Sequence, residues 1–170
     1  ATEISSAKGN IDIVGVSNAA TTGSNNSEVF INSAKVMAAS GVEPVEITIT
    51  GNGAATTGAS TTSHGVIVTG TGAEVVSRHL PVSITGVSHS TGSGNRHPGV
   101  EISTGAKIHT QGVANLTITG ESGASTVASA NNSGVLVSGA GTEVYTAQGN
   151  INLIGTSKAV STGGSNNNGV

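Results

Sequence analysis

Residues 99–120 read GVEISTGAKIHTQGVANLTITG, and the chain contains four versions of this pattern. The other versions begin at Glu28, Gly65 and Gly134, so equivalent positions recur after 37, 34 and 35 residues. A period in this range is typical of solenoids and other repeat arrays, in which each repeat packs mainly against its neighbours. The recurring residues form strands and turns, and no reactive side chain recurs with them, so the pattern indicates an architecture rather than a chemistry.

Each version of the pattern predicts three short strands. In the version quoted, these are residues 100–102, 106–108 and 116–118, where apolar residues alternate with polar ones and Gly or polar residues separate the runs. The outer members of each triplet share one face, because side chains alternate along a strand. Helices are disfavoured, since the apolar runs are short and interrupted by Gly or Pro. The sequence therefore predicts an all-β fold, a parallel β-solenoid with about 35 residues per coil, three short strands and one long polar loop.

The chain reads as a single solenoid segment over residues 1–170. Residues 1–27 align with residues 141–168, so the sequence begins in the middle of a repeat. Solenoids usually end in atypical capping repeats, and no such repeat is visible here. We therefore expect part of a longer repeat array, or a subunit whose ends neighbouring copies cover. The expected units are a partial coil at 1–27, coils at 28–64, 65–98, 99–133 and 134–168, and the start of the next coil at 169–170.

The composition excludes several classes of function. Charged residues make up 9% of the chain, and the six Lys and Arg residues are scattered, which leaves nucleic-acid binding without a basic patch. No apolar run reaches the 18 residues typical of a membrane span. The absence of Cys excludes disulfides and thiolate metal sites. A repeat rich in Gly, Ser, Thr and Asn and free of Cys suits an extracellular or cell-surface protein.

The consensus sequence of the repeat reads GVxISxGAxI, followed by NxTITG and GxNNxGV. This consensus resembles the repeat arrays of large bacterial surface proteins. Examples are filamentous-haemagglutinin-like adhesins and the passenger shafts of autotransporters. The resemblance implies a right-handed parallel β-helix that serves as a structural shaft in a fibre or in cell adhesion. Independently of the resemblance, the uncapped ends predict that the partner of the chain is itself, end to end, and an apolar outward column adds lateral bundling as a further option.

The second strand of each coil carries a charged residue at its outward position, and the sign alternates from coil to coil. Stacked at about 4.8 Å, these residues would form a structural charge ladder that fixes the register, because a slip by one coil would bring like charges together. The ladder comprises Glu3, Lys35, Glu74, Lys107 and Glu143.

The first strand of each coil has an outward column that is unusually apolar: Phe30, Ile67, Glu101 and Leu136. Phe30, Ile67 and Leu136 are candidates for a lateral interface with a neighbouring protomer. The alternative is that the polar loops of the chain itself cover them.

The third strand presents pairs of hydroxyl residues that resemble the flat Thr-x-Thr arrays of ice-binding proteins. A Thr-rich face of this kind predicts an alternative function, a surface-binding module for ice or carbohydrate. Thr is also simply a favourable residue for an exposed strand. The face would consist of Thr48, Thr50, Ser83, Thr85, Thr117 and Thr119.

Catalytic residue sets are not apparent in the sequence. There is one Asp and there are two Arg, and the five His residues lack metal-binding spacing. No Ser-His-Asp set can be placed together from proximity in the sequence. The histidines in the polar loops, His64, His89 and His97, are expected to be exposed. The sequence thus predicts a protein that is not an enzyme and that uses no cofactor, no metal, no nucleic acid and no membrane span.

Overall fold

The computed structural model describes residues 2–17, 26–39, 46–53, 55, 62–91, 96–124, 132–158 and 167–170. Within these ranges the chain forms strands and turns and contains no helix. The strands are β1 (Thr2–Ser6), β2 (Ile11–Val16), β3 (Asn26–Asn32), β4 (Ala34–Ala38), β5 (Ile47–Asn52), β6 (Ser63–Thr69), β7 (Glu74–Ser77), β8 (Val82–Val87), β9 (Val100–Ser103), β10 (Lys107–Thr110), β11 (Leu116–Glu121), β12 (Val135–Ser138), β13 (Glu143–Thr146) and β14 (Ile151–Thr156).

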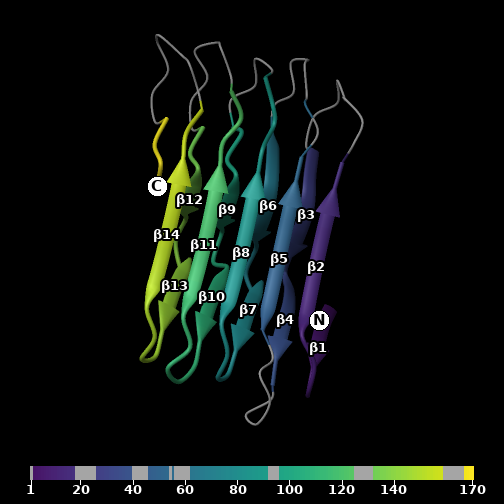
Figure 1. Ribbon diagram of the computed structural model, residues 1–170, viewed down its shortest axis with the longest axis vertical. Helices are drawn as coiled ribbons and strands as arrows, with labels where there is room; N and C mark the ends of the chain where they lie inside the picture. The colour runs from purple at the N-terminus through teal and green to yellow at the C-terminus, as the bar shows by residue number, and fades with distance from the viewer. Residues whose placement is uncertain are drawn as a thin grey trace.

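Each strand from β1 to β11 pairs in parallel with the strand three places further along the chain, which produces three sheets. The front sheet has the order β14-β11-β8-β5-β2, and it faces the viewer in Figure 1. Two sheets of shorter extent lie behind it, one above the other. The upper rear sheet is β12-β9-β6-β3, and the lower rear sheet is β1-β4-β7-β10-β13.

The chain winds through these sheets as a flattened right-handed solenoid. In Figure 1 the front strands point up, the rear strands point down, and each later coil lies further to the left. Equivalent strands are about 35 residues apart, as the repeat predicts. The predicted parallel β-solenoid is therefore confirmed.

The core lies between the front and rear layers. Val66, Ile84, Ile102, Ile118 and Val135, all predicted to point inward, are at most 1% exposed. Their side chains occupy every second position of their strands, so each sheet contributes a column of aliphatic residues to one shared cluster. The prediction of inward positions is confirmed.

A glycine with positive φ follows the upper rear strand in three coils. These are Gly70 at 97°, Gly105 at 80° and Gly139 at 94°. Left-handed backbone costs glycine nothing in steric terms, which allows the chain to bend between the upper and lower rear sheets.

A second column of glycines brings the two layers into backbone contact. Gly51, Gly86 and Gly120 pair in register in the front sheet. A Cβ atom on Gly86 would lie 2.8 Å from the carbonyl carbon of Gly99 and closer still to its oxygen. Only a residue without a side chain fits here, at the edge where the front sheet meets the start of the next upper rear strand.

Candidate functional site

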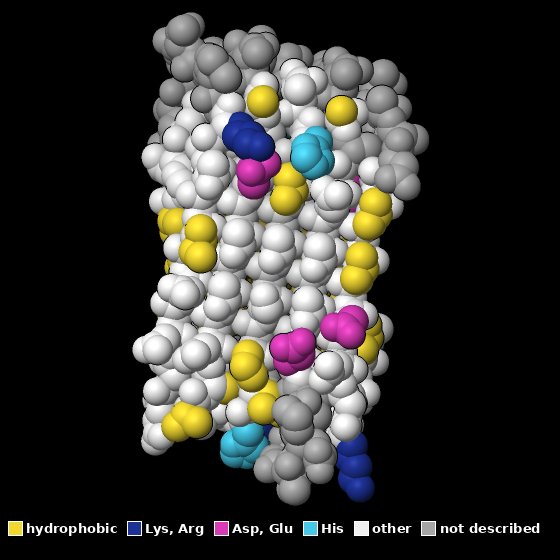
Figure 2. Space-filling model, in the orientation of Figure 1, with side chains coloured by type: hydrophobic (Ala, Val, Ile, Leu, Met, Phe, Trp, Pro, Cys, Tyr) yellow, Lys and Arg dark blue, Asp and Glu magenta, His cyan; other side chains and the backbone are white. Residues whose placement is uncertain are grey.

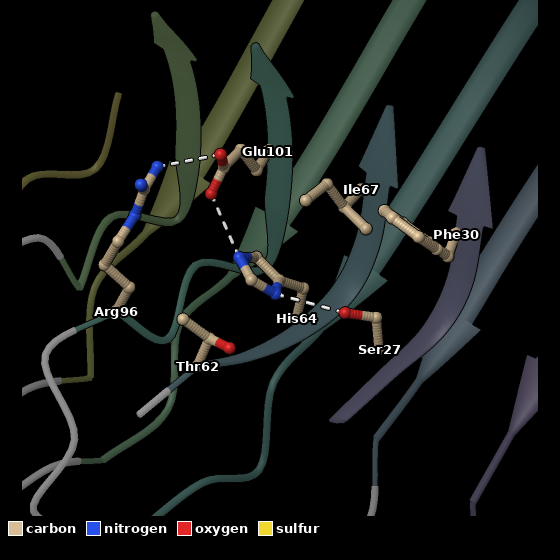
Figure 3. A pocket seen from close by; sticks show the side chains of 7 residues that line it. All are labelled: Ser27, Phe30, Thr62, His64, Ile67, Arg96 and Glu101. Atoms are coloured by element: carbon tan, nitrogen blue, oxygen red, sulfur yellow. Dashed lines mark hydrogen bonds and ion pairs between the residues drawn. The ribbon is translucent and has the colours of Figure 1, made fainter. Parts of the chain in front are cut away.

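A cavity of about 320 Å³ opens on the outer side of the upper rear sheet. Figure 3 shows its lining, which comes from three successive coils and mixes hydroxyl, charged and apolar groups. The lining residues are Ser27, Phe30, Thr62, His64, Ile67, Arg96 and Glu101.

Stacking of the coils brings these residues together. Ser27 pairs with His64 in the register of β3 and β6, and Ile67 pairs with Glu101 in the register of β6 and β9. An isolated bridge joins Thr62 to Arg96 at the same edge. The cavity therefore follows from the parallel register of neighbouring coils.

The polar side chains form one connected chain. Ser27 Oγ lies 3.2 Å from His64 Nδ1, and His64 Nε2 lies 3.0 Å from Glu101 Oε2. Arg96 Nη2 contacts the second carboxylate oxygen of Glu101 at 2.7 Å. The side chains of His64 and Glu101 are each 5% exposed, whereas that of Arg96 is 39% exposed. The buried carboxylate of Glu101 thus has two partners, His64 from the neighbouring coil and Arg96 from the residues just before β9.

The charge on Glu101 fixes the arrangement of protons. Burial alone would raise the pKa of Glu101, but the hydrogen bond from His64 and the positive charge of Arg96 outweigh burial and lower the pKa. The ionised carboxylate only accepts hydrogen bonds, so His64 Nε2 must donate one. In the neutral imidazole, Nδ1 then has a free lone pair and accepts the hydroxyl hydrogen of Ser27.

The lowered pKa of Glu101 predicts a loss of stability in acid. The carboxylate stabilises the fold fully above its unfolded-state pKa of about 4.3, and this contribution disappears as the pH falls through the folded-state value. Each unit of lowering corresponds to about 1.4 kcal/mol. We expect Glu101→Gln to be less stable than the wild type at pH 7 and to lose less stability between pH 6 and pH 3. Urea unfolding across this range measures both effects.

The exposed Glu46 provides the matched control for this measurement. Glu46→Gln removes the same charge at an exposed position, so its comparison with Glu101→Gln separates the effect of the buried ion pair from the effect of one charge. Equal acid slopes for the wild type and for Glu101→Gln would contradict the role assigned to Glu101.

The charge-ladder residues lie in one row of the lower rear sheet. Glu3 pairs with Lys35, Lys35 with Glu74, Glu74 with Lys107 and Lys107 with Glu143. Ion pairs of 2.8 Å join Lys35 to Glu74 and Lys107 to Glu143. The hydrogen bond to Glu143 raises the pKa of Lys107.

Glu74 also contacts a group that sequence analysis did not include in the ladder. Its Oε1 atom lies 2.7 Å from Nε2 of His109, which is 5% exposed and stacks on Tyr145 with ring centroids 4.6 Å apart. Burial would raise the pKa of Glu74, but the hydrogen bonds from Lys35 and His109 lower it overall.

The outward column of the first strands is interrupted by Glu101, which is buried although its neighbours in the column are more exposed. Phe30 is 59% exposed, and Ile67 and Leu136 are half-buried, whereas Glu101, between Ile67 and Leu136 in the register, is 4% exposed. Phe30 and Ile67 form the apolar wall of the cavity (Figure 3). The loops proposed as an alternative cover for this column lie largely outside the described residues.

The hydroxyl residues of the third strands form two rows across the front sheet. Ser83 pairs with Thr48 and Thr117, and Thr85 pairs with Thr50 and Thr119. Figure 2 shows the middle of this face without hydrophobic or charged side chains, and hydrophobic side chains border it on both sides. The array is three strands wide, because β2 and β14 carry other residues in these rows.

The expectation that loop histidines are exposed is wrong for two of them. His64 and His97 are 4% and 0% exposed, because neighbouring coils provide polar partners for His64 and the connection from β8 to β9 provides one for His97. His64 binds Ser27 and Glu101, and His97 Nε2 lies 3.4 Å from Ser90 Oγ. The signal that could have located the first group is its spacing: His64 is 37 residues from both Ser27 and Glu101. His79 and His89 are exposed.

Comparison with known proteins identifies no relative: no family model, no curated protein and no solved structure matches the chain. In the part of the chain that the structure describes, no three His, Asp or Glu residues gather in a way that could hold a metal ion. The same part contains no helix with the length and apolar character needed to cross a membrane.

Proposed function

We propose that this chain is a structural segment of an extracellular fibre or adhesin shaft, with coils that continue end to end. The observation that carries this proposal is the uniform parallel stacking of the coils, in which the strands of one coil continue in register in the next.

The exposure of the core columns rises sharply in the outermost coils. Ile4 in β1 is 50% exposed, whereas its register partner Val36 is 1% exposed. At the other end Ile151 in β14 is 43% exposed, whereas Leu116 beside it is fully buried. Strands at these edges also have unpaired backbone groups. One further coil on each end would cover the apolar side chains and pair the backbone.

The next coil has two possible sources, further repeats of the same polypeptide or a second copy of the chain. Copies stacked head to tail make a heterologous contact, which builds filaments rather than closed oligomers. The absence of cysteine suits a shaft that works outside the cell, where the redox state is not controlled.

The charge ladder determines how well two identical copies would join. In the register of the coils, β1 of one copy would lie beside β13 of the next. Glu143 would then face Glu3 of the neighbouring copy, and like charges directly opposite each other destabilise a sheet. A lysine in place of Glu3 would continue the alternation of sign.

We therefore expect Glu3→Lys to assemble end to end more readily than the wild type. Wild-type assembly should increase with salt, which screens the two glutamates. Sedimentation velocity at micromolar concentration, supported by electron microscopy, measures the length of the assemblies. Glu46→Lys is the matched control, because it makes the same change in net charge at an exposed site in the interior of the stack. If all three proteins remain monomers at every salt concentration, the proposal that separate copies of the chain stack end to end is wrong.

A second candidate function is surface binding by the Thr-rich face. Its support is the register of the two hydroxyl rows, which repeat at the spacing of parallel strands, about 4.8 Å. Thermal hysteresis of dilute solutions tests binding to ice. Thr85→Lys should abolish an effect of this face, whereas Thr71→Lys, in the exposed turn between β6 and β7, should preserve it.

A further inference from the structure

Ser27, His64 and Glu101 form a hydrogen-bonded chain that leads from a hydroxyl group to a buried carboxylate (Figure 3). A hydroxyl, an imidazole and a carboxylate in this order are the parts of an activated serine nucleophile, and such sets are recognised by geometry rather than by sequence order. Here Nδ1 faces the hydroxyl and Nε2 faces the carboxylate. Because Glu101 requires the proton on Nε2, Nδ1 is the basic nitrogen.

The cavity next to this chain has room for a substrate. Ser27 is half-buried in the lining of the cavity. The volume of the cavity, about 320 Å³, lies at the lower end of the range for small-molecule sites. Phe30 and Ile67 provide an apolar wall on which an acyl group could pack. A hydroxyl in a dry interior would have no substrate to attack, so this opening is necessary for chemistry.

Arg96 adds a cationic group to the same cavity. One terminal nitrogen of its guanidinium, Nη2, binds Glu101, and the side chain as a whole is 39% exposed where it lines the cavity. Fixed donors near a reacting carbonyl stabilise the negative charge that develops on its oxygen. The guanidinium is therefore the group in this cavity suited to that role.

We propose that Ser27 is the nucleophile of an acyl-transfer site that accepts small carboxylic esters, with His64 as the general base and Glu101 as the residue that positions it. This activity goes beyond the structural function proposed above. It also departs from the expectation that the chain is not an enzyme. That expectation arose because sequence proximity cannot place serine, histidine and acid together, whereas stacking of coils does.

The reaction proceeds in two balanced steps. Ser27 Oγ forms a bond to the ester carbonyl carbon while its proton passes to Nδ1 of His64. The carbon–oxygen bond to the leaving group then breaks, and the alcohol departs with that proton. Water then attacks the acyl–serine carbonyl carbon while one of its protons passes to Nδ1 of His64. The bond between this carbon and Ser27 Oγ breaks, the proton returns to Oγ, and a carboxylic acid is released.

The first test is covalent labelling with an alkyl fluorophosphonate, read by intact mass and peptide mapping. We expect labelling at Ser27 in the wild type and none in Ser27→Ala. The rate should fall about 100-fold or more in His64→Gln, in line with the usual contribution of a general base. Ser5→Ala, at an exposed serine of β1, should label like the wild type. Absence of labelling at Ser27 in the folded wild type, or labelling that is unchanged in His64→Gln, would overturn the proposal.

A second test needs no substrate, because it measures the reactivity of an introduced thiol. The wild-type chain contains no cysteine, so each variant below has a single thiol. In Ser27→Cys the only thiol would lie beside His64 and should react with iodoacetamide at pH 7 at least 10-fold faster than the thiol of Ser5→Cys. The addition of His64→Gln to Ser27→Cys should remove the difference, while circular dichroism confirms the fold of each variant. Equal alkylation rates in Ser27→Cys with and without His64→Gln would show a purely structural hydrogen bond.

Discussion

Replacement of Gly86 by alanine is expected to destabilise the solenoid by about 3 kcal/mol or more. The new Cβ atom would lie 2.8 Å from the carbonyl carbon of Gly99 and from Cγ2 of Val100, and closer still to the Gly99 oxygen. These atoms belong to the start of the next coil, whose backbone is held by pairing on both sides. A flexible side chain could move away, but this backbone could not do so without loss of hydrogen bonds, so the overpacking cost should exceed the usual range.

Urea unfolding followed by circular dichroism measures this loss. Gly9→Ala is the matched control, because a Cβ atom there would meet only Ser6 Oγ at an ordinary 3.5 Å. Gly9→Ala should remain within about 0.5 kcal/mol of the wild type. A stable Gly86→Ala protein would mean that the front and rear layers are not as close at this edge as the structure has them.

Removal of the Ile84 side chain is expected to cost about 2–5 kcal/mol. Ile84 is fully buried at the centre of the front sheet, between Ile49 and Ile118 in the register, so neighbours on both sides would border the cavity left by Ile84→Ala. The same change at Leu153 should cost less, because β14 is an edge strand and Leu153 is only half-buried.

Equilibrium unfolding of Ile84→Ala, Leu153→Ala and Thr85→Ala compares the three positions. Thr85 follows Ile84 on the same strand and points outward, so it controls for any effect of alanine on β8 itself. Equal losses at Ile84 and Leu153 would contradict a core that weakens toward the ends of the stack.

The solenoid could be predicted because two periods coincide in the sequence. Alternation along each strand assigns the inward residues, such as Val66 and Ile84, and the repeat of about 35 residues places equivalent strands side by side. Parallel stacking is the arrangement that satisfies both. The repeat length also places Glu3, Lys35 and the other ladder residues in one row, because each strand keeps its register with the equivalent strand of the next coil.

The cavity could not be predicted in the same way, because it depends on side chains that depart from the repeat. Glu101 occupies an outward position, like Phe30, and alternation alone would leave it in solvent. It is buried because His64 and Arg96, from adjoining positions of the stack, compensate its charge. His64 itself was assigned to a loop, although β6 begins one residue before it. These partners meet only once in the array, so their spacing of 37 residues is a single coincidence that no other coil repeats.

The parallel pairing of each coil with the next has a mechanical consequence. The hydrogen bonds between coils point along the axis of the stack, so tension along that axis pulls directly on them, and an end coil, which is paired on one side only, detaches first. A coil of about 35 residues, once detached, extends to about 120 Å. Coils deeper in the stack keep both neighbours and remain folded until they become the new end. Under tension such a shaft would lengthen in steps of one coil, and each detached coil could fold back onto the intact edge that it left.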